Sequence, residues 1–232
     1  MNEFNKYAKH HLGLHDKIFN GYQDFKSELP MIPQSSVTPT IIEERQLNVA
    51  AMSVFDRLMM DRIIWCAGAV DDRMAIIVQA QLMFLSQQDP KKTITMHIDS
   101  PGGSVKAGLS MVDVMKYIPT PIQTVNTGMA ASMGSVLLGA GDMRASLKHS
   151  KTMLHQSSGG AVGNIQDARI TMKEWEETNR ILFELLGEYC GKDAKQVEED
   201  ASRDLWLSSD EALSYGIIDE VIQPQKKKRE SK

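Results

Sequence analysis

Apolar and polar positions follow two alternating periods along the chain from residue 54 onward. Ser53 can cap a helix that runs through Met60, and Ile63–Cys66 is a short apolar run of the strand type. Asp72 can cap a second helix, whose apolar positions recur at helical spacing. These positions are Ile76, Ile77, Ala80, Met83 and Phe84. The pattern predicts a strand between two helices.

The same alternation continues toward the middle of the chain. A strand at 93–98 is followed by a helix at 104–117, and a strand at Ile122–Val125 by a helix at 132–141. A further strand is predicted near Met153. Repeated strand and helix units favour a parallel sheet covered by helices, so the sequence predicts an α/β fold.

The region after the last of these strands breaks the rhythm. Gly159–Gly163 is rich in glycine, and a long helix is predicted from Ile165 to Tyr189. The apolar positions of this helix recur at a spacing of 3.6, which usually marks a core or an interface. They are Ile170, Trp175, Ile181, Leu182 and Leu185.

Both ends of the chain differ from its middle. Residues 1–38 are polar and end in Pro30–Ser36, which cannot sustain a helix or a central strand. We expect a flexible, propeptide-like leader there. Residues 225–232 form a basic tail that we expect to be solvated, and one folded domain should span residues 39–224.

Composition excludes several classes of protein. The chain has 232 residues, of which 42% are hydrophobic and 24% charged, and a formal net charge of -4 gives no reason to expect nucleic acid as a partner. Two cysteines make no disulfide framework, and neither has metal-ligand spacing. The N-terminus has no apolar signal region, and no run approaches the length of a membrane span. We therefore expect a cytoplasmic protein that uses no metal or cofactor.

One serine lies in surroundings that suit a nucleophile. Ser132 is flanked by small side chains and glycines in Gly128–Gly134, which leave the hydroxyl uncovered and let the backbone bend sharply. The segment does not match the G-x-S-x-G elbow. Such clusters also occur where two backbones pack closely, and that alternative stays open on the cluster alone.

A second segment can supply backbone donors. The strand at 93–98 ends in Asp99–Gly103 and a helix follows. Free glycine amides at such a turn can bind the oxyanion of a tetrahedral intermediate. A plain Pro-Gly turn is the alternative.

Two further residues can complete a hydrolase. His155 is the best candidate base among six histidines, because it follows an apolar strand-like run and precedes a glycine-rich loop. Asp204 can supply a buried carboxylate that fixes the histidine tautomer. By pattern alone, an acid after Arg203 is more often part of a surface ion pair.

Together these segments resemble the Clp protease family, over about Pro39 to Val221. The motifs that carry the resemblance are Ser100–Gly103, Gly128–Gly134, Met153–Gln156, Leu207–Ala212 and Tyr215–Asp219. The resemblance implies that Ser132 is the nucleophile, His155 the general base and Asp204 the residue that orients it. It also implies an oxyanion hole made by the amides of Gly103 and Met133.

The resemblance has implications for fold, substrate and partners as well. It implies a crotonase-type ββα superhelix with a projecting strand and helix, the handle, and an assembly of two stacked seven-membered rings. A separate AAA+ unfoldase would feed in polypeptide substrates, because this chain has no G-x-x-x-x-G-K-[ST] phosphate loop. Substrate would contact Gly103, Ser104 and Val105 on one side and Gln156, Ser158 and Gly160 on the other.

Three departures from the family pattern stand out. The interval from Ser132 to His155 is 155 − 132 = 23 positions, slightly shorter than expected, which a surface turn at Arg144–Ser150 could absorb. Ser157 replaces the usual proline after His-Gln. Thr95 and His97 occupy outward positions that are commonly aromatic in the family, where they line pockets for the unfoldase.

Two functions from other classes remain. One is a catalytically silent scaffold subunit of a mixed ring, which the presence of all three candidate residues disfavours. The other is an acyl-CoA-binding enzyme of the crotonase type, which would have no use for a Ser-His-Asp set.

Overall fold

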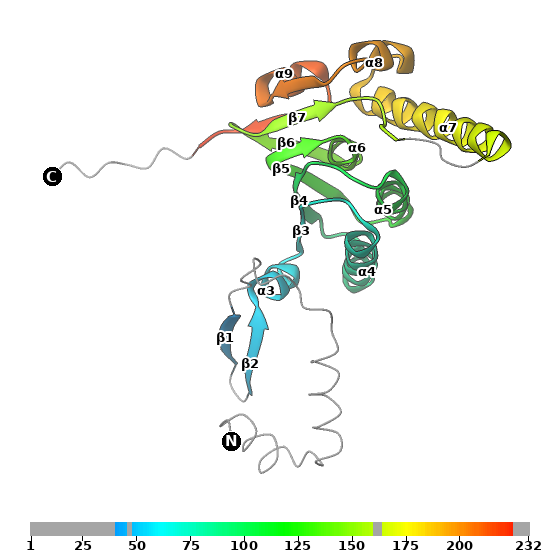
Figure 1. Ribbon diagram of the computed structural model, residues 1–232. Helices are drawn as coiled ribbons and strands as arrows, with labels where there is room; N and C mark the ends of the chain where they lie inside the picture. The colour runs from blue at the N-terminus through cyan, green and yellow to red at the C-terminus, as the bar shows by residue number, and fades with distance from the viewer. Residues whose placement is uncertain (1–39, 46–47, 160–163, 225–232) are drawn as a thin grey trace. The chain divides into compact units, whose positions relative to one another are not determined.

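The computed structural model describes residues 40–45, 48–159 and 164–224 (Figure 1). These residues fall into two compact units that divide between Val54 and Phe55. In the first unit, strand β1 (Thr40–Arg45) pairs antiparallel with strand β2 (Asn48–Ser53). Residues 1–38 and the basic tail at 225–232 lie outside the described residues.

The second unit alternates strands and helices. Its strands are β3 (Ile63–Ala67), β4 (Ile94–Ser100), β5 (Ile122–Ala131), β6 (Met143–Leu147), β7 (Lys151–Leu154), β8 (Leu205–Ser208) and β9 (Glu220–Ile222). The helices run from α3 (Val54–Met60), which begins at the division, through α4 (Asp72–Gln88), α5 (Val105–Tyr117), α6 (Met133–Gly139), α7 (Ile165–Cys190), α8 (Ala194–Asp200) and α9 (Ser209–Tyr215).

Strand β5 organises the sheet because it pairs with different neighbours along its length. Strands β3, β4, β5, β6 and β9 follow one another in parallel. The first half of β5 pairs with β6, whereas residues Met129–Ala131 pair with β7. Strand β8 then pairs antiparallel with β7. The C-terminal end of β5 is therefore enclosed between β4 and β7.

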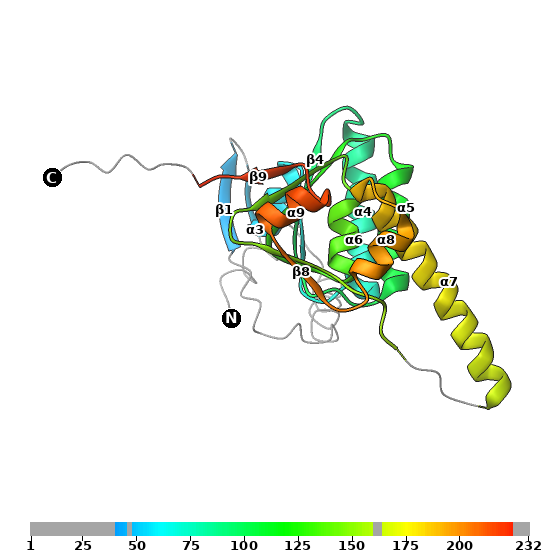
Figure 2. The same ribbon diagram turned by 90° about the horizontal axis from the view of Figure 1, so that it is seen from above.

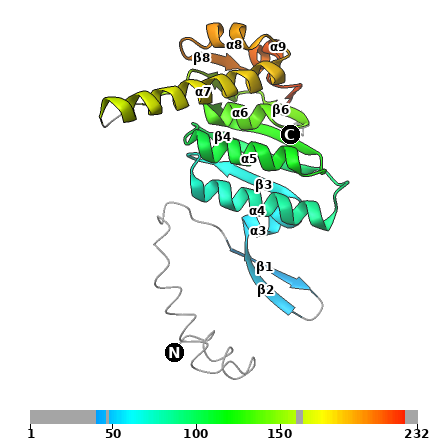
Figure 3. The same cartoon turned by 90° about the vertical axis from the view of Figure 1, so that its right-hand side faces the viewer.

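Helices α4, α5 and α6 lie in a layer against the sheet (Figure 3). Fully buried side chains of the helices meet those of the strands at this boundary, and they form the core of the unit. The largest include Leu82, Leu85, Met111, Leu137 and Leu138 from the helices and Ile94, Met96, Ile98 and Ile122 from the strands.

Most of the predicted elements are present, with shifts at their ends. The N-terminal cap of α4 is Asp71 and not Asp72, because the Asp71 carboxylate accepts the Met74 N–H at 2.7 Å. Strand β5 continues well beyond Val125, to Ala131, since its second half gains a new partner in β7.

The prediction of a surface turn at Arg144–Ser150 is wrong for most of these residues. Residues Met143–Leu147 form β6, which lies between β5 and β9 in the sheet. Arg144 donates through its guanidinium to the Asp219 carboxylate and to the Tyr189 carbonyl. Only Lys148–Ser150 remains as a turn, so most of this connection is a strand of the sheet.

Helix α7 combines a buried end with a projecting end (Figure 2). Leu182, Phe183 and Leu186 are buried, whereas Ile165 and Ile170 are 71% and 69% exposed. The expected strand at 159–163 lies largely outside the described residues. Of the helices that the structure describes, none is long and apolar enough to cross a bilayer.

Candidate active site

The carboxyl ends of three neighbouring strands bring the candidate residues together. Ser100 at the end of β4 pairs with Ala130 of β5, and Ala131 pairs with Met153 of β7. Because parallel strands end at the same edge of a sheet, the chain leaves β4, β5 and β7 side by side. Ser132 and His155 follow directly after β5 and β7.

Ser132 has a strained backbone at the junction of β5 and α6. Its φ of 53° and ψ of -123° make it one of two described residues other than glycine with positive φ. Such a conformation costs about 1–3 kcal/mol and persists only where the surroundings enforce it. Here the Ser132 N–H donates to the Met153 carbonyl at 2.9 Å, and the hydroxyl makes no bond to the α6 backbone. The Ser132 hydroxyl is therefore free to contact other groups of the candidate site.

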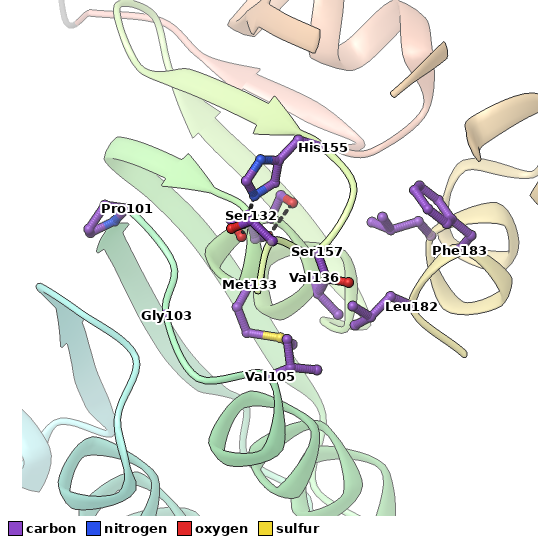
Figure 4. Close-up of a pocket in the computed structure, with 13 residues that line it drawn as sticks. Pro101, Gly103, Val105, Ser132, Met133, Val136, His155, Ser157, Leu182 and Phe183 are labelled. Carbon is purple, nitrogen blue, oxygen red and sulfur yellow. Dashed lines mark hydrogen bonds between the residues drawn. The ribbon is translucent and has the colours of Figure 1, made fainter. Parts of the chain in front are cut away.

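His155 contacts that hydroxyl. Its Nε2 lies 2.8 Å from the Ser132 Oγ, which is hydrogen-bond distance (Figure 4). Leu154, the last residue of β7, is fully buried and anchors the strand, and the His155 side chain is 24% exposed. The ring is thus held beside Ser132 while it remains reachable from solvent.

Asp204 lies opposite His155 because of the antiparallel register between β7 and β8. Leu154 pairs with Leu205, so His155 and Asp204 occupy the next position of the ladder. The Asp204 Oδ1 lies 3.5 Å from the His155 Nδ1, longer than a good hydrogen bond. Its side chain is 62% exposed, so the expectation of a buried carboxylate is wrong.

Gly103 and Met133 line the same pocket as Ser132, and the backbone N–H of each has no acceptor in the pairing or helix to which the residue belongs. Val70 donates to the Gly102 carbonyl at 2.9 Å and accepts the Ser104 N–H at 2.8 Å, so the Gly103 N–H takes no part in this pairing. Met133 is the first residue of α6, where an N–H lacks an acceptor within the helix.

Glycine is required at the turn that approaches Ser132. A Cβ added at Gly102 would lie 2.6 Å from the Ser132 Cβ, and one at Gly103 would lie 2.3 Å from the Val70 carbonyl oxygen. Both glycines have positive φ, at 92° and 151°. The turn can come this close to the serine only without side chains.

A pocket of about 250 Å³ opens beside the serine and histidine (Figure 4). Its walls are formed by the turn after β4, the start of α6, the segment after His155 and the buried part of α7. The lining residues are Pro101, Gly103, Val105, Ser132, Met133, Ser135, Val136, His155, Ser157, Ser158, Leu182, Phe183 and Leu186. The pocket can accept an apolar side chain next to the hydroxyl.

The sequence pattern did not predict the apolar wall of this pocket. Leu182, Phe183 and Leu186 belong to α7, whose spacing indicated only a core or an interface. Nothing in the helical period tells which turn of a helix faces a site, so the sequence carried no signal for this wall.

The residues expected to contact substrate are placed differently from one another. Val105 and Ser158 line the pocket, whereas Ser104 caps α5 and accepts the Ala107 N–H at 3.3 Å. Gln156 lines a second hollow against Trp175 of α7. Gly160 lies outside the described residues.

The arrangement is suited to nucleophilic acyl transfer. A hydroxyl at 2.8 Å from an imidazole nitrogen can pass its proton to the ring as it attacks a carbonyl carbon. In the described part of the chain, no group of three or more His, Cys, Asp or Glu side chains could hold a metal ion.

Comparisons with known proteins agree on one family. The model of the Clp protease family matches residues 45–225. A protein of Porphyromonas gingivalis (strain ATCC BAA-308 / W83), named ATP-dependent Clp protease proteolytic subunit, is 46% identical over 229 residues, which cover 98% of this chain and 100% of that protein. A protein of Bacteroides fragilis (strain YCH46) with the same name is 44% identical over 96% of this chain and 99% of its own.

These findings confirm the predicted fold class, an α/β fold of the crotonase type. They also confirm the predicted class of enzyme, a serine peptidase. The chain belongs to the Clp protease family.

Proposed function

We propose that this chain is a serine endopeptidase that degrades unfolded polypeptides through Ser132, His155 and Asp204. The 2.8 Å contact between the Ser132 Oγ and the His155 Nε2 carries the proposal. Ser132 attacks the scissile carbonyl while His155 takes the hydroxyl proton, and His155 then donates that proton to the leaving amine. Water hydrolyses the resulting acyl-enzyme with His155 again as the base. Asp204 orients the ring through Nδ1.

The amides of Gly103 and Met133 would hold the oxyanion that forms in each step. Their support is geometric, since neither N–H is used by the pairing or helix in which it lies, and both residues line the pocket beside Ser132. Donors fixed in advance stabilise the charge that develops in the transition state.

The substrate would lie extended between the turn after β4 and the segment after His155. Val105 and Ser158 border the pocket from these two sides. A strand added beside such backbone gains main-chain hydrogen bonds regardless of its sequence. Preference would come from the side chain that enters the apolar wall of Leu182, Phe183 and Leu186, so we expect faster cleavage after large apolar residues.

Labelling with a fluorophosphonate followed by peptide mapping tests the proposal directly. Modification of Ser132 is the expected result, because the reagent reacts only with serines activated by a base. A protein that is not labelled would be a silent scaffold subunit, and labelling at another serine would show that Ser132 is not the nucleophile.

Assembly and location complete the proposal. We propose two stacked seven-membered rings in the cytoplasm, with an AAA+ unfoldase as the partner that supplies substrates. Exposed apolar side chains on α4, namely Ile76, Ile77 and Phe84, supply surface for contacts between subunits. Both cysteines are free, as expected in a reducing compartment.

Binding of the unfoldase should weaken on acidification. His97 faces outward on β4 and stacks on Trp65, with ring centroids 4.8 Å apart, and its neighbours across the sheet, Trp65 and Val125, are uncharged. Burial lowers the pKa of His97 from its usual value near 6.5, so the ring is neutral at pH 7 and gains its charge only below that value. An apolar guest would bury the ring further and oppose protonation. Affinity should therefore fall as the pH drops below about 6.5.

The matched variant His97→Tyr should bind more tightly and lose this dependence on pH. The added ring offers more apolar area, at about 25 cal/mol per Å² buried. Affinity for the cognate unfoldase, measured against pH for both proteins, decides the matter, and equal affinities with parallel curves would rule the idea out.

The leader should be removed by the enzyme itself. Residues 1–38 form a polar segment that contains proline, and such segments are accessible to proteolysis. Intact mass spectrometry should show a shortened wild-type chain and a full-length Ser132→Ala chain. If both proteins keep residues 1–34, self-processing is wrong.

A further inference from the structure

The segment that follows His155 is tied to α7 by one cluster of hydrogen bonds. The Ser157 hydroxyl accepts the indole N–H of Trp175 at 2.7 Å and lies 3.1 Å from the Asn179 Oδ1, to which it donates. The same Oδ1 accepts the Ser157 backbone N–H at 3.2 Å. We call Ser157, Trp175 and Asn179 the Ser157 clamp.

The clamp is the sole hydrogen-bonded support that the structure gives to residues 156–159 among the residues it describes. Strand β7 ends at Leu154, and His155 is already bonded to Ser132. Beyond that point, Gln156, Ser158 and Gly159 make no hydrogen bond to another described residue. The position of this segment therefore depends on α7.

The Trp175 ring also packs against the backbone of residues 156–159. A Cβ added at Gly159 would lie 3.2 Å from the Trp175 Cζ2 and 3.3 Å from its Cη2, so the indole packs against the backbone there. Trp175 thus contacts the segment at two points, the Ser157 hydroxyl and the Gly159 backbone.

Trp175 and Asn179 lie one turn apart on the face of α7 that continues into the pocket. A spacing of four residues places both side chains on the same side of the helix. One to two turns further, Leu182, Phe183 and Leu186 line the pocket next to Ser132. One face of α7 therefore both holds residues 156–159 and forms the apolar wall of the pocket. The distance between these residues and the wall is set by this one helix.

We propose that the Ser157 clamp positions residues 156–159 as the backbone edge on which substrate docks, with Trp175 and Asn179 as positioning residues. The inference rests on the proposed function of the site. An edge ordered in advance costs the substrate less entropy on binding than one that must be ordered by it. The Ser132 to His155 contact is set by β5 and β7, so loosening the clamp affects substrate binding and not the reactivity of the serine.

The test compares two clamp variants with two controls. Trp175→Phe keeps an aromatic ring but removes the N–H and the part of the indole that contacts Gly159, and Asn179→Ala removes the acceptor of both Ser157 bonds. Asn179→Asp keeps an acceptor oxygen at this position. Thr178→Ala deletes a hydroxyl from the same helix that makes no hydrogen bond to another described residue. Each protein is assayed at the oligomeric size of the wild type, checked by size exclusion.

Three quantities are measured for each protein: KM and kcat for a fluorogenic peptide, and the rate of fluorophosphonate labelling at Ser132. One lost hydrogen bond changes an equilibrium by about threefold to tenfold, so KM should rise by that factor in Trp175→Phe. Asn179→Ala loses two hydrogen bonds, so its KM should rise by at least as much. Their kcat and labelling rates should stay within about twofold of the wild type. Asn179→Asp and Thr178→Ala should keep the wild-type KM.

Two results would overturn the inference. Either KM is unchanged in both clamp variants, or labelling slows in proportion to the loss of peptide turnover, which would mean that the clamp holds His155. Failure of the proposed function is a separate result, because the wild-type Ser132 would then not be labelled at all.

Discussion

Ser132→Ala should lose peptide hydrolysis by about 10⁴-fold or more, the loss typical of a triad nucleophile. The substitution removes one oxygen and keeps the Cβ that fits beside Gly102. The backbone bonds that hold the residue also remain, because its N–H still donates to the Met153 carbonyl and its carbonyl still accepts from Ser135. Folding and assembly should therefore be unaffected.

Hydrolysis of a short fluorogenic peptide, which needs no unfoldase, measures this loss. Ser214→Ala is the matched control, because among the described residues the Ser214 hydroxyl bonds only to the Asp210 carbonyl on α9, so this variant should keep wild-type turnover. Retention of most activity by Ser132→Ala would refute the assignment of the nucleophile.

Asp204→Asn should lower kcat by less than Ser132→Ala does. Loss of an enclosed triad carboxylate costs about 10⁴-fold in kcat, whereas exposed ion pairs contribute only about 0.2–1 kcal/mol. Asp204 is 62% exposed and lies 3.5 Å from His155, between these two cases. We expect a loss of about 10- to 10³-fold in kcat with KM little changed.

The control for Asp204→Asn is Asp210→Asn, another exposed acid, which pairs with Lys148 and follows the end of β8, whereas Asp204 precedes its start. Steady-state kinetics at pH 7 separate the cases. If Asp204→Asn keeps more than half of the wild-type kcat, then Asp204 does not orient His155. A loss equal to that of Ser132→Ala would show instead that the carboxylate is enclosed in the working enzyme.

The sequence determined the features that depend on neighbouring residues. Helical and alternating periods place α4, α5 and α7 within a few residues of their observed ends, because these periods record which face of each element is buried. Ser132 and His155 were recognisable as candidates because Ser132 lies among small residues and His155 at the end of a predicted strand. The Clp protease motifs are likewise short and local.

Tertiary structure decided the features that depend on pairing between distant segments. The second half of β5 is a strand only because β7 is available beside it, and the register of β7 with β8 brings Asp204 to His155 while leaving it exposed. The apolar wall on α7 faces the pocket because of how that helix packs on α6. Local propensity contains none of these distances, since each one is set by contacts between residues far apart in the chain.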